Sequence, residues 1–333
     1  MGSKITVLGA GSWGSALANV LFENGHEVMI WTRDEEQKEE INTDHTNRHY
    51  LPHFKFPKDL RASTRLEEAV KDRDLLVFVI PTKGMRELAK RVNTLLNKKV
   101  TIVHASKGLE ETTYKRISTL LKEEIAPDYL NGLVTLSGPS HAEEVIAKDL
   151  TTITAASDNT RAAEYVQSVF INDYFRVYTN SDIIGVEIGA ALKNIIALGA
   201  GVIAGLGYGD NAKAGLVTRG LAEISRLGVK LGADSLTFMG LSGVGDLIVT
   251  CTSPHSRNWR AGYQIGQGKD VQSVVDGMGM VVEGISTTKA AYELAQSHEI
   301  EMPITEAIYN VVYNKADVKH VILNLMQREG KAE

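Results

Sequence analysis

The feature that most constrains the fold of this chain is a glycine-rich turn close to its first residue. A short apolar, β-branched run, Lys4–Leu8, leads directly into the motif GAGSWG at residues 9–14. An apolar helical stretch follows at 16–22, and a second strand-like run comes at Glu27–Trp31. This order of strand, GxGxxG, helix and strand is typical of dinucleotide-binding domains. A glycine-rich turn without a ligand is the plainer alternative.

Each glycine of the motif has a separate physical role. Gly9 permits the tight turn, Gly11 lets the backbone approach a pyrophosphate, and Gly14 lets the helix pack closely on the strand. The helix that begins here presents free N–H groups, which favour an anion. The three glycines are therefore candidate cofactor-binding residues.

The end of the second strand bears on the choice of cofactor. NAD enzymes usually place an acidic residue there to hold the ribose 2′-hydroxyl, whereas this chain has Thr32, Arg33 and Asp34. Arg33 can pair with a 2′-phosphate, and Asp34 comes one position late. These residues favour NADP(H) and leave NAD(H) open. A solvent-exposed arginine with no ligand is the alternative.

Strand-like and helical runs alternate up to about Thr179. Further apolar runs occur at 75–80, 100–104, 133–136, 151–156 and 175–178. Near-continuous apolar strands suit a parallel sheet that is buried on both faces. We therefore predict an α/β fold, with a Rossmann-type dinucleotide-binding domain at residues 1–180 and an all-α substrate and catalytic domain at residues 181–333.

Two of these strands end in residues that suit contact with a ligand. Lys107 follows the strand at 100–104, where a lysine can reach a phosphate or carbonyl oxygen; a surface lysine is the alternative. The next strand ends in small residues that include Gly138 and Ser140. Ser140 is also able to cap the helix that follows.

After Ser181 the pattern is helical, and one helix stands out. Residues 188–204 carry a single charge, Lys193, on a face whose neighbours at i±3 and i±4 are small or apolar. A lysine in such surroundings must find a partner, reach water or lose its proton. A structural salt bridge and a membrane span are alternatives, although the central lysine and the many glycines argue against a span. The neighbours on that face are Gly189, Ala190, Ile196 and Ala197.

Two later segments carry isolated polar residues. Asp246 and Thr250 lie in an apolar run, where Asp246 could also be a helix cap. Ser256 can cap the helix after them, so that Arg257 and the free N–H groups face an anion. The hypothesis is a phosphate cradle at the start of that helix. Glu283 lies in a turn into another helix, where it could be an ordinary first-turn acid.

Composition excludes several classes of function. The formal net charge is −5 and no Lys/Arg block is dense enough to follow a phosphate backbone, so we expect no nucleic-acid partner. The single cysteine, Cys251, excludes an internal disulfide and suits a reducing compartment. A strand within the first residues leaves no room for a signal peptide, and we expect a cytoplasmic protein. His45, His49 and His53 are spaced by four, but Pro52 interrupts any helix there, so we predict no metal site.

The motifs of this chain, in their order, resemble those of the bacterial NAD(P)-dependent sn-glycerol-3-phosphate dehydrogenases. The resemblance covers nearly the whole chain and rests on GAGSWG (9–14), SKG (106–108), SGPSHAEEV (137–145), ALKNIIALGAG (191–201), LSGVGDLIVTCTS (241–253), HSRN (255–258) and VVEG (281–284). It implies reversible reduction of dihydroxyacetone phosphate to sn-glycerol 3-phosphate, which supplies the glycerol phosphate of phospholipids. It also implies a homodimer.

The resemblance further implies a role for individual residues. Lys193 matches the lysine of the family's LKN motif and would be the general acid and base. The nucleotide contacts would be Ser12, Trp13, Arg33, Tyr50, Lys107, Ala142, Arg257, Val281 and Glu283. The substrate contacts would be Lys107, Gly138, Ser140, Lys193, Asn194, Asp246, Thr250, Ser256, Arg257 and Asn258. From the residues alone, packing under the polar, irregular loop of residues 35–66 is favoured for Tyr50 over a place beside the nucleotide.

Two departures from the family pattern and two rival functions remain open at this stage. Trp259 stands where many relatives carry an arginine, and Thr32 precedes Arg33 where some relatives differ. A related two-domain dehydrogenase of the hydroxyacid or phosphogluconate type would also use a lysine on the first helix after the nucleotide domain. A non-catalytic NADP(H)-sensing protein would need no proton donor, and Lys193, Asn194 and Asp246 argue against it.

Overall fold

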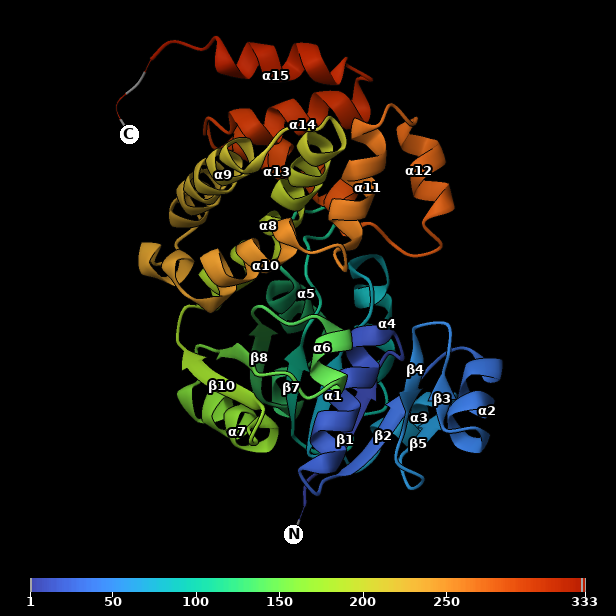
Figure 1. Ribbon diagram of the computed structural model, residues 1–333. Coiled ribbons are helices and arrows are strands. Elements are labelled where there is room, and N and C mark those ends of the chain that lie inside the picture. Colours follow the sequence, from blue (N-terminus) through green and yellow to red (C-terminus); the bar gives the residue numbers. More distant parts are fainter. Residues whose placement is uncertain (1, 331, 333) are drawn as a thin grey trace. The chain divides into compact units, whose positions relative to one another are not determined.

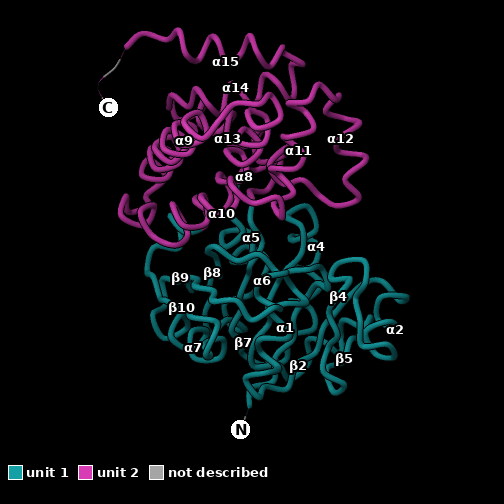
Figure 2. Tube along the Cα trace, in the orientation of Figure 1, with its two compact units in different colours: residues 1–107, 115–186 teal, residues 108–114, 187–333 magenta. Residues whose placement is uncertain are grey.

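The computed structural model describes residues 2–330 and residue 332, and it divides into two compact units (Figure 2). Unit 1 comprises residues 1–107 and 115–186, and unit 2 comprises residues 108–114 and 187–333. The division therefore falls six residues after the predicted limit at residue 180 (186 − 180). The first turn of the long helix after the sheet explains this shift, because Ile183 and Val186 pack on Ala156 of unit 1.

Unit 1 is built on an eight-stranded sheet with the order β10-β9-β8-β7-β6-β1-β2-β5 (Figure 1). Every neighbouring pair is parallel except β8 and β9. The strands are β1 (Lys4–Leu8), β2 (Glu27–Trp31), β5 (Arg61–Ser63), β6 (Leu75–Phe78), β7 (Val100–His104), β8 (Leu130–Ser137), β9 (Thr151–Ala156) and β10 (Phe175–Asn180). A separate two-stranded sheet pairs β3 (Thr46–Asn47) with β4 (Leu51–Lys55).

Helices cover both faces of the large sheet, as the near-continuous apolar strands predict. Successive residues of β1 point to opposite sides, so that Ile5 and Val7 join one core cluster and Leu8 joins the other. The first cluster lies under α1 (Ser12–Glu23), α6 (Ala142–Ile146) and α7 (Thr160–Phe170). The second lies under α3 (Leu66–Val70), α4 (Met85–Asn93) and α5 (Ile117–Glu124). Helix α2 (Glu35–Thr43) packs on β5.

The strand order places a topological switch point between β1 and β6. From β1 the chain moves outward to β2 and β5, and then returns to the other side of β1 to build β6, β7 and β8. Doubly wound sheets bind ligands in the crevice at the carboxyl ends of the strands at this point. The predicted Rossmann-type fold is confirmed.

Strand β9 runs against β8 because the connection between them contains only the short helix α6. A parallel return requires a long crossover across the sheet face. The alternation of strands and helices in the sequence did not reveal this reversal.

Unit 2 is helical, as predicted. Its helices are α8 (Ile183–Gly205, which starts in unit 1), α9 (Asp210–Lys230), α10 (Asp246–Thr252), α11 (Arg257–Gly266), α12 (Val271–Gly277), α13 (Glu283–Ser297), α14 (Pro303–Tyr313) and α15 (Val318–Met326). A 3-10 segment, η3 (Ser235–Met239), and a π-helical turn, η4 (Leu241–Gly245), precede α10. Figure 1 shows α9, α10, α11, α13 and α14 arranged around α8.

Helix α8 is the core of unit 2. Its glycines let neighbouring backbones approach closely, because a Cβ on Gly201 or Gly205 would lie 2.0 or 2.3 Å from a carbonyl oxygen of α11. The helix is long and apolar enough to cross a membrane, yet 83% of its most apolar window is buried inside the protein. This is the behaviour expected of an apolar helix at the centre of a helical bundle.

Candidate active site

The glycine loop between β1 and α1 has the geometry that its motif predicts. Gly9 has φ +124°, a conformation that favours glycine, and a Cβ there would lie 2.3 Å from the carbonyl oxygen of Val79. A Cβ on Gly14 would lie 2.0 Å from the carbonyl oxygen of Gly9. In contrast, a Cβ on Gly11 would have no atom within 4 Å. Gly11 therefore faces open space at the start of α1, which fits the approach of a pyrophosphate.

Two polar side chains that the sequence did not single out hold this loop in place. The carbonyl oxygen of Ala10 accepts hydrogen bonds from Gln37 Nε2 at 2.9 Å and from Asn47 Nδ2 at 2.8 Å. Ser12 Oγ donates to the carbonyl oxygen of Tyr50 at 3.1 Å, which places Tyr50 beside the loop. Gln37 and Asn47 lie in a polar, irregular stretch of sequence, and no local pattern marks them.

Arg33 and Asp34, which follow β2, have different surroundings. Asp34 caps α2, because its carboxylate accepts hydrogen bonds from the N–H groups of Glu36 and Gln37. Arg33 is exposed and has no hydrogen bond or ion pair in the described part of the chain. Trp13 is half-buried, and its buried indole N–H has no acceptor among the described residues. Arg33 and Trp13 thus present donors that a nucleotide could use.

Lys107, Gly138 and Ser140 lie together at the ends of β7 and β8. The carbonyl oxygen of Gly138 accepts a hydrogen bond from Lys107 Nζ at 3.3 Å and one from Ser140 Oγ at 2.9 Å. Gly138 has φ +147°, and a Cβ there would lie 2.9 Å from Ile153 Cα. Ser140, although able to cap the next helix, does not do so. Helix α6 begins at Ala142 without a side-chain cap, because the Ser140 hydroxyl is engaged within its own turn.

The structure places Lys193 in a buried polar cluster within unit 2. Its ammonium donates to Asp246 Oδ1 and to Thr250 Oγ1, each at 2.6 Å. All three residues are at least 95% buried. Thr250 Oγ1 in turn donates to the carbonyl oxygen of Asp246. A buried ion pair with matched hydrogen bonds is tolerated only when its geometry is good, and such pairs are frequent at catalytic sites.

Local structure explains how these side chains meet. Lys193 lies in the middle of α8, whereas Asp246 and Thr250 lie one turn apart on the same face of α10. Asp246 is not the cap of α10, which corrects the alternative drawn from the sequence. The preceding Gly245 is the N-cap, and the Asp246 carboxylate points to Lys193. Burial raises the pKa of the adjacent Cys251 thiol to about 12, so this thiol stays protonated in the neutral range.

The predicted cradle lies at the start of α11. Ser256 caps this helix by accepting a hydrogen bond from the N–H of Trp259 at 3.2 Å, as expected. Arg257 is exposed and donates to the carbonyl oxygen of Val281 at 3.1 Å. Free N–H groups and a guanidinium therefore occupy the same helix end, an arrangement that binds anions.

Asn258 connects this cradle to the start of α13. Its Oδ1 accepts a hydrogen bond from the N–H of Gly284 at 2.8 Å, and both residues are buried. A Cβ on Gly284 would lie 2.7 Å from both Asn258 Oδ1 and the carbonyl oxygen of Asn194. Three predicted site segments, ALKN, HSRN and VVEG, therefore meet at Gly284. Glu283 is the first residue of α13.

Trp259, which departs from the family pattern, packs along its own helix. Its ring stacks on Tyr263 with centroids 5.1 Å apart and an interplanar angle of 18°. Its buried indole N–H has no acceptor in the described part of the chain. The first turn of α11 carries two exposed arginines, Arg257 and Arg260.

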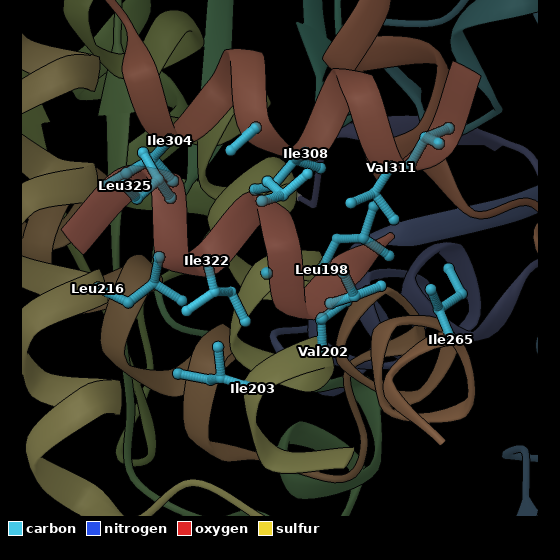
Figure 3. Close-up of a pocket in the computed structure, with 15 residues that line it drawn as sticks. Leu198, Val202, Ile203, Leu216, Ile265, Ile304, Ile308, Val311, Ile322 and Leu325 are labelled. Atoms are coloured by element: carbon cyan, nitrogen blue, oxygen red, sulfur yellow. The ribbon is translucent and has the colours of Figure 1, made fainter. Parts of the chain in front are cut away.

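A concave feature elsewhere in unit 2 does not suit a charged ligand. Figure 3 shows an apolar pocket between α8, α9, α11, α14 and α15, into which Leu198, Ile308 and Ile322 project. All of its lining residues are apolar, so it offers no partner for a phosphate. The candidate active site is therefore the polar cluster around Lys193 and not this pocket.

Comparison with known proteins gives a consistent result over the whole chain. Residues 4–163 match the family model described as NAD-dependent glycerol-3-phosphate dehydrogenase N-terminus, and residues 182–323 match the corresponding C-terminus model. The NAD(P)+ glycerol-3-phosphate dehydrogenase of Enterococcus faecalis is 63% identical over 333 residues, covering 100% of this chain and 98% of the relative. That of Lactiplantibacillus plantarum is 62% identical over 336 residues, covering 100% and 99%.

A solved structure agrees with these relatives. The crystal structure of glycerol-3-phosphate dehydrogenase from Coxiella burnetii superposes with a TM-score of 0.94 at 34% sequence identity. It covers 98% of this chain and 99% of that chain. The similarity thus extends over both units.

Proposed function

The chain belongs to the NAD-dependent glycerol-3-phosphate dehydrogenase family, and on that premise we propose that Lys193 is the general acid and base of its reaction. The protein is an NAD(P)-dependent oxidoreductase that interconverts dihydroxyacetone phosphate and glycerol 3-phosphate. The observation that carries the proposal is the buried cluster of Lys193, Asp246 and Thr250. In cells the product would supply glycerol phosphate for phospholipid synthesis.

The role of Lys193 follows from the charge that develops during ketone reduction. A nicotinamide cofactor held by the glycine loop of residues 9–14 would supply or accept the hydride. As the ketone becomes an alkoxide, the Lys193 ammonium can hydrogen-bond the oxygen and give it a proton. In the reverse direction the neutral amine takes the hydroxyl proton.

Burial and the Asp246 carboxylate act in opposite directions on the protonation of this lysine. Burial alone favours the neutral amine, whereas the carboxylate of Asp246 at 2.6 Å favours the ammonium. Thr250 Oγ1 accepts from Lys193 Nζ and fixes its direction. Lys193 thus has a carboxylate partner for its ammonium form and a buried environment that disfavours the charge, the two opposing influences that a proton-exchanging lysine requires.

The phosphate of the substrate would be held away from the reacting carbon. We assign this role to Ser256, Arg257 and Asn258 at the start of α11, where N–H groups and a guanidinium favour an anion. Binding energy from the non-reacting phosphate then orients the ketone. In unit 1, Lys107, Gly138 and Ser140 remain candidate substrate contacts through their shared turn.

Cofactor binding is assigned to the glycine loop and to the residues around it. Gly9, Gly11 and Gly14 shape the loop, and Ser12, Trp13 and Tyr50 flank it. The exposed guanidinium of Arg33 favours NADP(H), although NAD(H) remains a candidate. The other proposed nucleotide contacts are Lys107, Ala142, Arg257, Val281 and Glu283.

A direct assay tests this function and separates it from its rivals. When purified protein is mixed with NADPH and dihydroxyacetone phosphate, the absorbance of NADPH should fall. A parallel reaction with NADH gives the cofactor preference. Turnover with a hydroxyacid pair and none with dihydroxyacetone phosphate would support the rival two-domain dehydrogenase. Cofactor binding without turnover of either substrate would support a sensing protein.

Two further properties are proposed from the family alone. We expect a cytoplasmic homodimer. Analytical ultracentrifugation at micromolar concentration should give the mass of two chains, and a monomer mass throughout would contradict the dimer. Fractionation of the source cells should recover the activity with the soluble fraction.

A further inference from the structure

The segment that carries Asp246 begins with an unusual turn. Residues Leu241–Gly245 form a π-helical turn, η4, in which the N–H of Gly245 donates to the carbonyl oxygen of Gly240 at 3.2 Å. The N–H of Asp246 donates back into this turn, to the carbonyl oxygen of Leu241. Single π turns are rare and recur at functional sites. The backbone position of Asp246 is therefore set directly by η4.

The turn is seated against α8 at a glycine. A Cβ on Gly189 would lie 2.5 Å from the carbonyl oxygen of Ser242, a separation that real side chains do not show. Ser242 is 98% buried, so its carbonyl cannot turn out to water. Gly189 lies one helical turn before Lys193 and on the same face of α8. The absence of a side chain at Gly189 is therefore what allows η4 to lie on α8 at this point.

The turn η4 is also packed tightly against η3. A Cβ on Gly243 would lie 2.1 Å from the carbonyl oxygen of Phe238 in η3. The turn is thus held between α8 and η3 by two backbone contacts. Any atom added at Gly189 would have to displace η4, and Asp246 with it, or spread the helices apart.

We propose that Gly189 and the π turn η4 form a positioning device that holds the Asp246 carboxylate against Lys193. Helix α8 contacts this segment at two places. Gly189 lies against the carbonyl oxygen of Ser242, and Lys193 pairs with Asp246. Gly189 is a positioning residue, since it acts through Asp246 and touches no reacting atom. The inference rests on the proposed role of Lys193 as acid and base.

The test compares two alanine substitutions on the same helix. Gly189→Ala introduces a Cβ 2.5 Å from the Ser242 carbonyl oxygen, and Gly205→Ala introduces one 2.3 Å from that of Tyr263. Both clashes involve a backbone oxygen, but only the first lies at the segment that carries Asp246. Thermal unfolding, kcat, KM and the pH profile of dihydroxyacetone phosphate reduction are measured for both variants and for the unmodified protein.

We expect both variants to lower the melting temperature and only Gly189→Ala to change the chemistry. A displacement on the order of 1 Å costs roughly a hundredfold in kcat. Loss of the nearby carboxylate favours the neutral amine, so the alkaline fall in reduction rate should move about one pH unit lower. The buried Cys251 thiol also interacts electrostatically with Lys193, and burial raises the pKa of this thiol to about 12.

Two outcomes would overturn the proposal. One is a Gly189→Ala variant whose pH profile matches that of the unmodified protein while its stability falls. The other is an equal profile shift in Gly205→Ala. If Gly189→Ala does not fold, deletion of Val244, which shortens η4 without adding an atom to α8, should give the same shift, and an unchanged profile would refute the proposal.

The proposed function and this inference fail differently. If Lys193 is not the acid and base, Lys193→Met retains turnover, and the inference falls with the function. If only the positioning device is wrong, Lys193→Met is inactive while Gly189→Ala titrates normally. A Lys193 side chain labelled with ¹⁵N gives an independent readout by NMR, because its proton loss on raising the pH can be followed without turnover.

Discussion

The two units build their candidate sites from different parts of the chain. In unit 1 the site is mainly backbone: a glycine loop, the Gly138 turn and a helix N-terminus, positioned by contacts that exclude a Cβ. In unit 2 it is mainly side chain: a lysine, an aspartate and a threonine, buried and hydrogen-bonded to one another. A cofactor that is common to many enzymes can be held by main-chain geometry, whereas proton transfer requires a particular titratable group.

This difference predicts that substitutions in the two units fail in different ways. A substitution in the glycine loop should act by steric exclusion and affect cofactor affinity. A substitution in the buried cluster should act on the chemical step. Five experiments test this distinction, and the most damaging substitution comes first.

Lys193→Met should have the largest effect. Removing a general acid and base costs about 10²–10⁴-fold in kcat, which is about 3–5 kcal/mol in the barrier. Cofactor binding by unit 1, followed by fluorescence titration with NADPH, should be unchanged. Because the substitution leaves the Asp246 carboxylate buried without its partner, the double variant Lys193→Met/Asp246→Asn serves as the stability control. A kcat within about tenfold of the unmodified protein would contradict the assignment.

Two alanine substitutions in the glycine loop should have different effects. Gly14→Ala should lower the stability of the fold, whereas Gly11→Ala should weaken cofactor binding. The Gly14 Cβ would lie 2.0 Å from the Gly9 carbonyl oxygen, so this variant should lose up to about 3 kcal/mol of folding free energy. The Gly11 Cβ meets no atom within 4 Å, and its φ of −71° suits alanine. Gly11→Ala should therefore keep its melting temperature without cofactor and raise the KM for NADPH by about tenfold. An unchanged KM for NADPH in Gly11→Ala would mean that the cofactor does not approach the backbone at Gly11.

Glu223→Gln tests a buried carboxylate in unit 2 that serves the fold alone. Glu223 accepts hydrogen bonds from the N–H groups of Ile304 and Thr305 and from the Thr305 hydroxyl at the start of α14. Replacing one oxygen by an amide donor should cost about 2 kcal/mol of stability and leave kcat unchanged. A fall in kcat with intact stability would assign Glu223 to the site.

The same carboxyl has a defined pH dependence. Burial raises the pKa of Glu223 above its ordinary value of 4.5. The folded state therefore binds this proton more tightly than the unfolded state. Its stabilising contribution is complete below pH 4.5 and is lost as the pH rises through the raised value. The free energy of unfolding in urea is measured for the unmodified protein and for Glu223→Gln at a series of pH values. The difference between the two proteins should shrink as the pH rises through the raised pKa of Glu223, and a constant difference would contradict this prediction.

Arg33→Ser should give the smallest effect. If Arg33 pairs with a 2′-phosphate, kcat/KM with NADPH should fall about tenfold, or 1.4 kcal/mol, whereas kcat/KM with NADH should stay within about twofold. Arg161→Ser, at an exposed arginine on α7, is the matched control and should change neither value. Equal losses with both cofactors would show that Arg33 contacts a part that they share.

The fold of unit 1 was predictable because its signals are local. The apolar runs that form β1, β6 and β7, together with the spacing of Gly9, Gly11 and Gly14, indicate strands and a turn from neighbouring residues alone. The reversal of β9 was not predictable, since strand direction depends on how the connection crosses the sheet. The sequence also did not predict that residues 108–114 belong to unit 2. The Tyr114 hydroxyl donates a hydrogen bond to Glu293, which lies far along the chain.

Local sequence patterns were enough to indicate the two-part architecture, the nucleotide loop and the unusual position of the Lys193 charge on an apolar helix. The folded chain was needed to show that Asp246, 53 residues away, is the partner of Lys193, and that the π turn which leads into Asp246 packs on Gly189. The physical reason is that periodicity and turn chemistry act over a few residues. The pairing of a buried charge depends instead on the packing of distant helices, and on the small separations that glycines permit between their backbones.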